Sequence, residues 1–336
     1  MTSDMKSPAA TENPTTLALD IRGLWAHYMT PAGAVKAVDG VTFSLKKGET
    51  LGLIGESGSG KTSTALALMR LLDPPAQVGG EVLVNGENIF DLSENEMRKA
   101  RFTKIALVTQ GAMNSLNPVM RIRPQIADIF SAHGIKMGRD ASDKRVSELL
   151  RAVDLDPSVA GMYPHELSGG MKQRVVIAMA IALDPDLIIA DEPTSALDVV
   201  VQRQVMRTLM RVQRDVGAAM ILIGHDMGLM AQVVDHAGIM YAGKLVELGP
   251  VKEMFANPLH PYTELLVKSL PSMRAKGVFK SIPGLTPSLL DLPSGCTFNP
   301  RCPYAEDKCR TDKPEYKTAS KGHMISCHLR GLEVSK

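Results

Sequence analysis

Gly55-Glu56-Ser57-Gly58-Ser59-Gly60-Lys61-Thr62 is the stretch that decides the fold of this 336-residue chain. It matches the pattern G-x-x-x-x-G-K-[ST], whose glycines let backbone amides point at phosphate oxygens. The apolar run Thr50–Ile54 before it predicts a strand, and residues 62–72 predict a helix whose amino-terminal end attracts anions. We therefore expect Lys61 to bridge the β- and γ-phosphates of a nucleotide and Thr62 to bind Mg²⁺. The candidate nucleotide-binding residues of the loop are Gly55, Ser57, Gly58, Ser59, Gly60, Lys61, Thr62 and Ser63.

A second apolar run, Leu187–Ala190, ends in the acids Asp191 and Glu192. In enzymes with such a phosphate loop, an aspartate at a strand end holds Mg²⁺, directly or through water. The glutamate after it would polarise the attacking water as a general base. An isolated acidic pair more often caps a helix, so the motifs around this pair have to decide between the two interpretations.

Three other side chains stand near the ends of predicted strands. Gln110 follows a strand predicted over 105–109, and His225 follows one over 220–224. Taken alone, the glutamine is an ordinary polar strand end and the histidine is a structural residue. Tyr28 lies just before a glycine-containing loop, and the alternative interpretation is that it is an ordinary core or edge-strand tyrosine. Their position among the phosphate motifs makes all three candidates for the nucleotide site.

A second glycine motif, Leu167-Ser168-Gly169-Gly170-Met171-Lys172-Gln173-Arg174, lies between the two phosphate motifs and resembles the signature of ABC-type ATPases. Residues 193–198, directly after the acidic pair, resemble the loop that lines the dimer seam in the same family. With the phosphate loop, the acids and the histidine in order, residues 17–330 resemble the nucleotide-binding subunit of an ABC transporter.

The resemblance implies roles for the remaining candidates. Gln110 would contact the metal and the lytic water, so that Thr62, Gln110 and Asp191 together hold Mg²⁺. His225 would reach the γ-phosphate and orient Glu192, which makes Glu192, His225 and Gln110 the catalytic set. An aromatic under the adenine ring would be Tyr28, with Trp25 and His27 as alternatives. The contacts to an ATP bound on a second subunit would be Ser168, Gly169, Gly170 and Asp198.

The resemblance also implies partners. Two ATPase subunits of the family close head to tail, and the second one is often homologous but not identical. The helical subdomain would receive a cytoplasmic helix from a permease of two membrane subunits. An extracytoplasmic substrate-binding protein would supply this permease with substrate. An isolated chain should then hydrolyse ATP weakly, because its pocket is incomplete until a second subunit closes on it.

The composition changes near residue 250, after which ten of the 21 prolines lie between Pro250 and Pro314. We interpret this region as a separate carboxy-terminal extension. Its cysteine pattern, C-x5-C-x6-C-x17-C, and residues 258–263 resemble the extension of oligopeptide and dipeptide importer ATPases. Four thiolates suit a [4Fe–4S] cluster, which the resemblance favours, while zinc with His323 or His328 and free thiols are alternatives. The candidate cluster ligands are Cys296, Cys302, Cys309 and Cys327.

Bulk properties exclude several classes of function. The formal net charge is only +2 and 4% of residues are aromatic, which argues against a nucleic-acid partner. No apolar run approaches the roughly 18–20 residues that a spanning helix needs. Residues 1–16 are polar, lack the apolar block of a secretory signal and are expected to form a disordered tail. We therefore expect a cytosolic protein that meets the membrane through a partner.

The sequence thus predicts an α/β P-loop ATPase of the ABC type with a mostly parallel core sheet, an antiparallel β subdomain and an inserted helical subdomain. The ATPase domain spans 17–256, its helical subdomain about 112–170, and the extension 257–336. The expected function is ATP-driven peptide import at the cytoplasmic face of the inner membrane. Nickel or sugar import, a soluble ABC protein of translation or DNA repair, and a subunit with a degenerate site are the alternatives.

Overall fold

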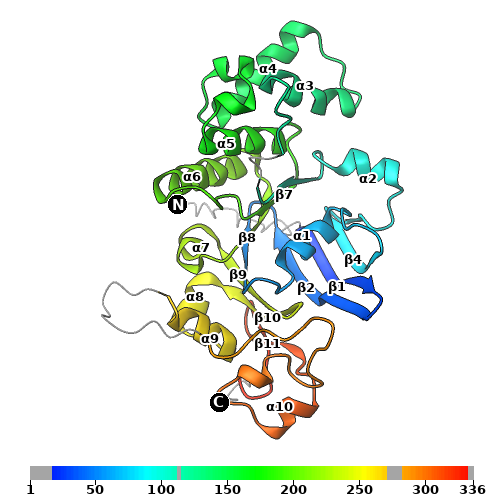
Figure 1. Cartoon of the computed structure of the whole chain (residues 1–336), viewed down its shortest axis with the longest axis vertical. Helices are drawn as coiled ribbons and strands as arrows, with labels where there is room; N and C mark the ends of the chain where they lie inside the picture. The colour runs from blue at the N-terminus through cyan, green and yellow to red at the C-terminus, as the bar shows by residue number, and fades with distance from the viewer. Residues whose placement is uncertain (1–16, 112–114, 271–281, 332–336) are drawn as a thin grey trace, which may run out of the picture.

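The computed structural model describes residues 17–111, 115–270 and 282–331. Two sheets form the middle of the molecule, a group of helices lies at one end and the carboxy-terminal extension at the other (Figure 1). The tail predicted over 1–16 and the first residues of the predicted helical subdomain, 112–114, lie outside the described residues. None of the described helices is both long and apolar enough to cross a membrane.

The larger sheet has eight strands in the order β11-β12-β10-β9-β3-β8-β7-β6. Its parallel part places β3 between β8 and β9, as the expected P-loop fold requires. Strands β3, β7 and β8 are buried along their whole length, which is why they appear in the sequence as continuous apolar runs. The strands are β3 (Thr50–Ile54), β6 (Ile105–Val108), β7 (Leu187–Asp191), β8 (Ala219–Gly224), β9 (His236–Tyr241), β10 (Lys244–Pro250), β11 (Tyr316–Ser320) and β12 (His323–Ser326).

The smaller sheet is the predicted antiparallel subdomain, in the order β2-β1-β4-β5. A tight turn at Asn85-Gly86 joins β4 to β5, and both residues have positive φ angles, as a two-residue hairpin turn of this kind requires. The strands are β1 (Leu17–Thr30), β2 (Gly33–Lys46), β4 (Ala76–Val84) and β5 (Glu87–Asn88).

Helices α3 to α5 lie at one end of the molecule, while α1 and α7 lie beside the sheets in its middle (Figure 1). The helix that follows the phosphate loop is α1 (Lys61–Leu68), and α2 (Glu94–Ala100) begins with a capping box formed by Ser93 and Glu96. The predicted helical subdomain contains α3 (Ile122–Ala132) and α4 (Arg139–Ala152), and α5 (Gly169–Ala180) packs beneath them. The remaining helices are α6 (Val199–Val216), α7 (Met227–Val233), α8 (Val251–Ala256), α9 (Pro261–Lys268) and α10 (Asp307–Thr311).

The carboxy-terminal extension is not a separate appendage, contrary to our expectation. Strand β12 pairs antiparallel with β10 and so continues the ATPase sheet. Two fully buried aromatics of the extension, Tyr262 and Phe298, pack on Tyr241 of β9, with ring centroids 4.7 and 5.1 Å from its ring. A high proline content predicted an independent segment, but the aromatic side chains and the open edge of β10 fasten it to the domain.

Candidate active site

The phosphate loop connects β3 to α1 and fits tightly between neighbouring strands. A Cβ at Gly55 would lie 2.2 Å from the Met240 carbonyl oxygen, and one at Gly60 would lie 2.1 Å from the Ala37 carbonyl oxygen. Gly60 also has a φ of 101°, a conformation that side chains disfavour. Only glycine fits both positions, so the backbones of β2 and β9 dictate the path of the loop.

Lys61 lies inside this loop. Its Nζ donates to the carbonyl oxygens of Gly55 and Glu56, at 2.8 and 2.9 Å, and to Ser59 Oγ at 3.3 Å. Burial lowers the pKa of Lys61, and the carboxylates of Glu192 and Asp191 act against that shift. The ammonium group is therefore held where the loop encloses it, close to two acids.

Residues from β1, β2, α1 and several connecting segments line one cavity of about 360 Å³ above the loop. Tyr28 of β1 lies at its side, and the Tyr28 hydroxyl is 3.5 Å from Ser63 Oγ of α1. The predicted site residues that line the cavity are Tyr28, Ser57, Gly58, Gly60, Lys61, Thr62, Ser63, Gln110, Glu192 and His225. The structure thus brings together side chains that are up to about 200 residues apart in the sequence.

Two of the predicted catalytic residues, Gln110 and His225, contact the third, Glu192. Gln110 Nε2 donates to Glu192 Oε2 at 3.0 Å, and His225 Nδ1 lies 3.4 Å from Glu192 Oε1. Glu192 has a φ of 45°, and its backbone N–H donates to the Ile223 carbonyl oxygen at 3.0 Å. A positive φ is costly for a residue with a side chain, and here β8 holds it in place. This turn aims the carboxylate into the cavity.

Asp191 lies behind Glu192 at the end of β7 and is 3% exposed. Burial raises its pKa, and a hydrogen bond with the Thr62 side chain acts in the opposite direction. Its Oδ1 atom has no hydrogen-bond partner among the described residues. A buried carboxylate oxygen without a partner, beside a threonine hydroxyl, fits a hard cation such as Mg²⁺.

The signature residues lie elsewhere. Ser168 caps α5 by accepting a hydrogen bond from Met171 N at 3.3 Å, and Asp198 caps α6 in the same way. A Cβ at Gly170 would lie 2.5 Å from Val201 Cγ1, so α5 and α6 pack closely there. Among the described residues that line the 360 Å³ cavity, none comes from 168–170 or is Asp198. One chain therefore does not bring its two glycine motifs to a common cavity.

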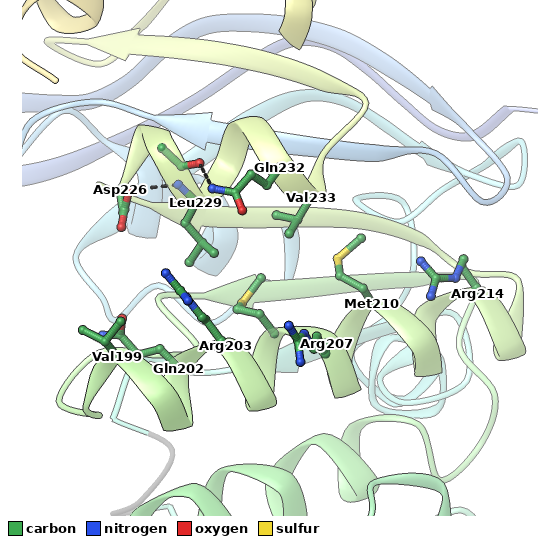
Figure 2. A pocket seen from close by; sticks show the side chains of 12 residues that line it. Val199, Gln202, Arg203, Arg207, Met210, Arg214, Asp226, Leu229, Gln232 and Val233 are labelled. Carbon is green, nitrogen blue, oxygen red and sulfur yellow. Dashed lines mark hydrogen bonds between the residues drawn. The ribbon is translucent and has the colours of Figure 1, made fainter. Parts of the chain in front are cut away.

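A second cleft, of about 710 Å³, lies between α6 and α7. Side chains of the two helices face one another across it, with Arg203 and Leu229 on opposite sides (Figure 2). The described residues that line it include none of the predicted site residues. The predicted nucleotide-binding residues instead lie at the smaller cavity, beside the phosphate loop.

Leu289 is a cavity-lining residue that sequence reasoning missed. It belongs to the carboxy-terminal extension, lines the nucleotide cavity and accepts a hydrogen bond from Lys36 N at 3.1 Å through its carbonyl oxygen. The leucine follows no motif, so no local signal could have identified it.

The structure does not support the predicted metal site at the cysteines. The four thiols form no disulfide, and the described part of the chain contains no group of His, Cys, Asp and Glu side chains arranged to hold a metal ion. Burial raises the pKa of Cys296 to about 11 and also raises that of Cys302. In the absence of a metal, burial thus favours the protonated form of these two thiols.

The two histidines considered as zinc ligands make other contacts in the structure. His323 Nε2 lies 2.8 Å from Glu247 Oε1, and His328 Nε2 lies 2.9 Å from the Asp312 carbonyl oxygen. His323 is 3% exposed and ties β12 to β10. It is thus a structural residue of the sheet.

Comparison with known proteins agrees with this geometry. The family model described as "ABC transporter" matches residues 38–195, and "Oligopeptide/dipeptide transporter, C-terminal region" matches 246–309. The oligopeptide transport ATP-binding protein AppF of Bacillus subtilis is 44% identical, covering 90% of this chain and 92% of AppF. The dipeptide transport ATP-binding protein DppD of Escherichia coli is 42% identical, covering 92% and 96%.

Solved structures agree as well. A dimeric post-hydrolysis state of the ATP-binding cassette MJ0796, bound to ADP and Pi, has a TM-score of 0.62 and 26% identity, covering 69% of this chain and 98% of that one. The fold and the site together define an ATPase of the ABC class. The chain belongs to the ABC transporter family, in its group of oligopeptide and dipeptide transport ATP-binding proteins.

Proposed function

We propose that this chain is the ATP-hydrolysing subunit of an importer that takes up di- or oligopeptides through a membrane permease. The contact of Glu192 with both Gln110 and His225 at the cavity of the Lys61 loop carries the assignment of hydrolysis. The match of residues 246–309 to the extension of oligopeptide and dipeptide transporters supports the choice of peptides. Nickel or sugar import is the alternative within the same branch.

In the proposed mechanism, Glu192 accepts a proton from water as the water oxygen attacks the γ-phosphorus and ADP leaves with the bridging oxygen. Gln110 and His225 hold the carboxylate of Glu192 in place. Lys61 and the loop amides stabilise the negative charge on the transferred group. Thr62, Asp191 and Gln110 would hold Mg²⁺, which neutralises phosphate charge when bound. Tyr28 contacts the adenine ring.

We further propose that hydrolysis needs a second ATPase subunit. Ser168, Gly169, Gly170 and Asp198 lie outside the cavity of their own chain and would contact ATP on the partner. The partner is a homologous, non-identical chain, and the pair drives two permease subunits. An extracytoplasmic binding protein supplies the substrate to the permease. The assembly places the chain on the cytoplasmic face of the inner membrane, as a peripheral subunit.

The [4Fe–4S] cluster stays a proposal. Its support is that Cys302, Cys309 and Cys327 all lie close enough to Cys296 to influence its pKa. Protein purified without oxygen should then contain four iron and four sulfide per chain, and it should lose them when Cys309→Ala is introduced. Fresh protein without iron or sulfide would exclude the cluster, and zinc in its place would favour the alternative metal.

Glu192→Gln tests the proposed chemistry. The variant keeps the shape of the side chain but cannot accept a proton, so it should bind ATP and hold a closed dimer while turnover falls at least 100-fold. ATPase assays and size-exclusion chromatography with ATP measure the two effects. Wild-type turnover in the variant would refute the role of Glu192.

A further inference from the structure

Glu56, the second residue of the phosphate loop, is bound by side chains of the carboxy-terminal extension. Arg301 forms a two-pronged ion pair with it: Nη1 lies 2.7 Å from Oε2 and Nη2 lies 2.9 Å from Oε1. The Arg301 side chain is only 4% exposed. Such forked pairs between a guanidinium and a carboxylate fix geometry more strictly than a single hydrogen bond.

Both partners have further contacts that restrict their movement. Arg301 Nε donates to the Pro283 carbonyl oxygen at 2.8 Å, and the guanidinium lies over the Tyr241 ring, 5.7 Å from its centroid. Thr286 Oγ1 donates to Glu56 Oε2 at 2.7 Å, and Glu56 N donates to the Tyr262 hydroxyl at 3.1 Å. The extension therefore holds the loop by a side chain and by its backbone.

Glu56 also connects this grip to the nucleotide cavity. Its carbonyl oxygen accepts a hydrogen bond from Lys61 Nζ at 2.9 Å. The loop between these residues contains Gly58 with a positive φ, and a glycine-rich segment loses much conformational freedom when it is fixed. An anchor that already fixes one end of the loop reduces the entropy that nucleotide binding must still remove.

We propose that Arg301 is a positioning residue of the ATP site, which acts through Glu56 to hold the Lys61 loop in the shape that accepts phosphate. The proposal rests on the assigned role of the Lys61 loop in binding ATP. The competing interpretation is that the ion pair only fastens the extension to the domain. The two differ in whether nucleotide affinity depends on the pair when the chain stays folded.

The test uses the full-length chain with Arg301→Met, Glu56→Gln and both changes together. If Arg301 acts through Glu56, Arg301→Met should raise the Kd of a fluorescent ATP analogue, and the KM for ATP, about tenfold, while kcat at saturating ATP changes less than twofold. The double variant should bind no more weakly than the weaker single variant, because both changes break the same interaction. Arg310→Ala is the matched control, since this exposed arginine lies in the same extension.

Three results would overturn the proposal: unchanged Kd and KM in folded Arg301→Met, effects of the two single changes that add up in the double variant, or an equal effect of Arg310→Ala. Arg301→Lys, which keeps the charge but not the fork, replaces Arg301→Met if that variant does not fold, and it should show an intermediate Kd. Lys61→Ala separates this inference from the site assignment. If Lys61→Ala binds ATP normally, the assigned site is wrong. If Lys61→Ala loses ATP binding while Arg301→Met keeps it, the site is right and only the proposed role of Arg301 is wrong.

Discussion

Gly55 shows how one missing side chain shapes the nucleotide site. The Met240 carbonyl oxygen of β9 occupies the place that a Cβ would take, at 2.2 Å. Because this atom belongs to a backbone in the middle of a sheet, it cannot move aside as a flexible side chain could. The phosphate loop and β9 must therefore shift together if anything larger than glycine stands at this position.

We expect Gly55→Ala to destabilise the chain by about 1–3 kcal/mol and to weaken nucleotide binding, since overpacking a fixed backbone costs energy of this order. Urea unfolding and binding of a fluorescent ATP analogue measure the two effects. Gly138→Ala is the control, because a Cβ there meets nothing within 4 Å. Equal stability of the two variants would contradict the prediction.

His260 connects the chemistry of one side chain to the attachment of the helix α9. Its ring Nδ1 accepts a hydrogen bond from Tyr262 N at 3.0 Å, and its backbone N–H donates to Glu247 Oε2 at 2.8 Å. Burial lowers the pKa of His260 to about 4. The nearby Glu247 carboxylate opposes this shift and Arg330 adds to it. The neutral ring thus caps the start of α9, while the backbone N–H of the same residue contacts β10.

This burial predicts a pH dependence. The pKa of His260 is lower in the folded chain than in the unfolded chain, where it is about 6.5, so the unfolded chain takes up the proton first. Its contribution to stability is complete above pH 6.5 and is lost as the pH falls towards 4. Between pH 7 and 4.5 the free energy of unfolding should fall by about 2–3 kcal/mol more than in His260→Asn. Urea unfolding at several pH values measures this difference. The same pH dependence of the free energy of unfolding in the unsubstituted chain and in His260→Asn would contradict the prediction.

The elements that the sequence predicted share a clear physical signal. Strands β3, β7 and β8 are fully buried and appear as unbroken apolar runs beside motifs, so pattern alone identified them. Strands β11 and β12 carry no such pattern; they are strands because β12 pairs with β10, about 75 residues earlier. Pairing of this kind depends on tertiary structure, and a window of local sequence does not contain it.

The candidate site divides in the same way. The residues of Gly55–Ser63, Asp191 and Glu192 belong to motifs whose chemistry requires them, and the structure places Lys61, Thr62 and Glu192 at one cavity. Leu289 and Arg301 lie in a proline-rich segment without a motif. Their importance comes from where that segment packs, so only the three-dimensional structure could reveal them.

At the scale of the whole molecule, the two glycine motifs lie at different places. The cavity contains the Lys61 loop, while Ser168 and Asp198 act as helix caps outside it. In the solved cassette MJ0796, bound to ADP and Pi, the cassette is dimeric. The proposal of a second ATPase subunit rests on the separation of the two motifs in one chain.

A monomeric sample should therefore hydrolyse ATP at least 100-fold more slowly per chain than the assembled pair, because donors to the γ-phosphate are missing. Turnover per chain, measured with increasing amounts of the partner subunit and with sedimentation in parallel, checks this. The rate should rise as the dimer forms, and Ser168→Arg should remove the rise. Full turnover in a fraction that sediments as a monomer would contradict the prediction.

The pairing of β12 with β10 also has a consequence for synthesis. A ribosome makes β10 long before residues 323–326, and Glu56 long before Arg301. Until the last strand emerges, the nascent sheet has an open edge, and unpaired edges promote association between chains. A chain interrupted after residue 300 would carry every nucleotide motif and still expose that edge. We therefore expect cellular quality control to remove a chain truncated by an early stop codon, even though its nucleotide motifs are intact.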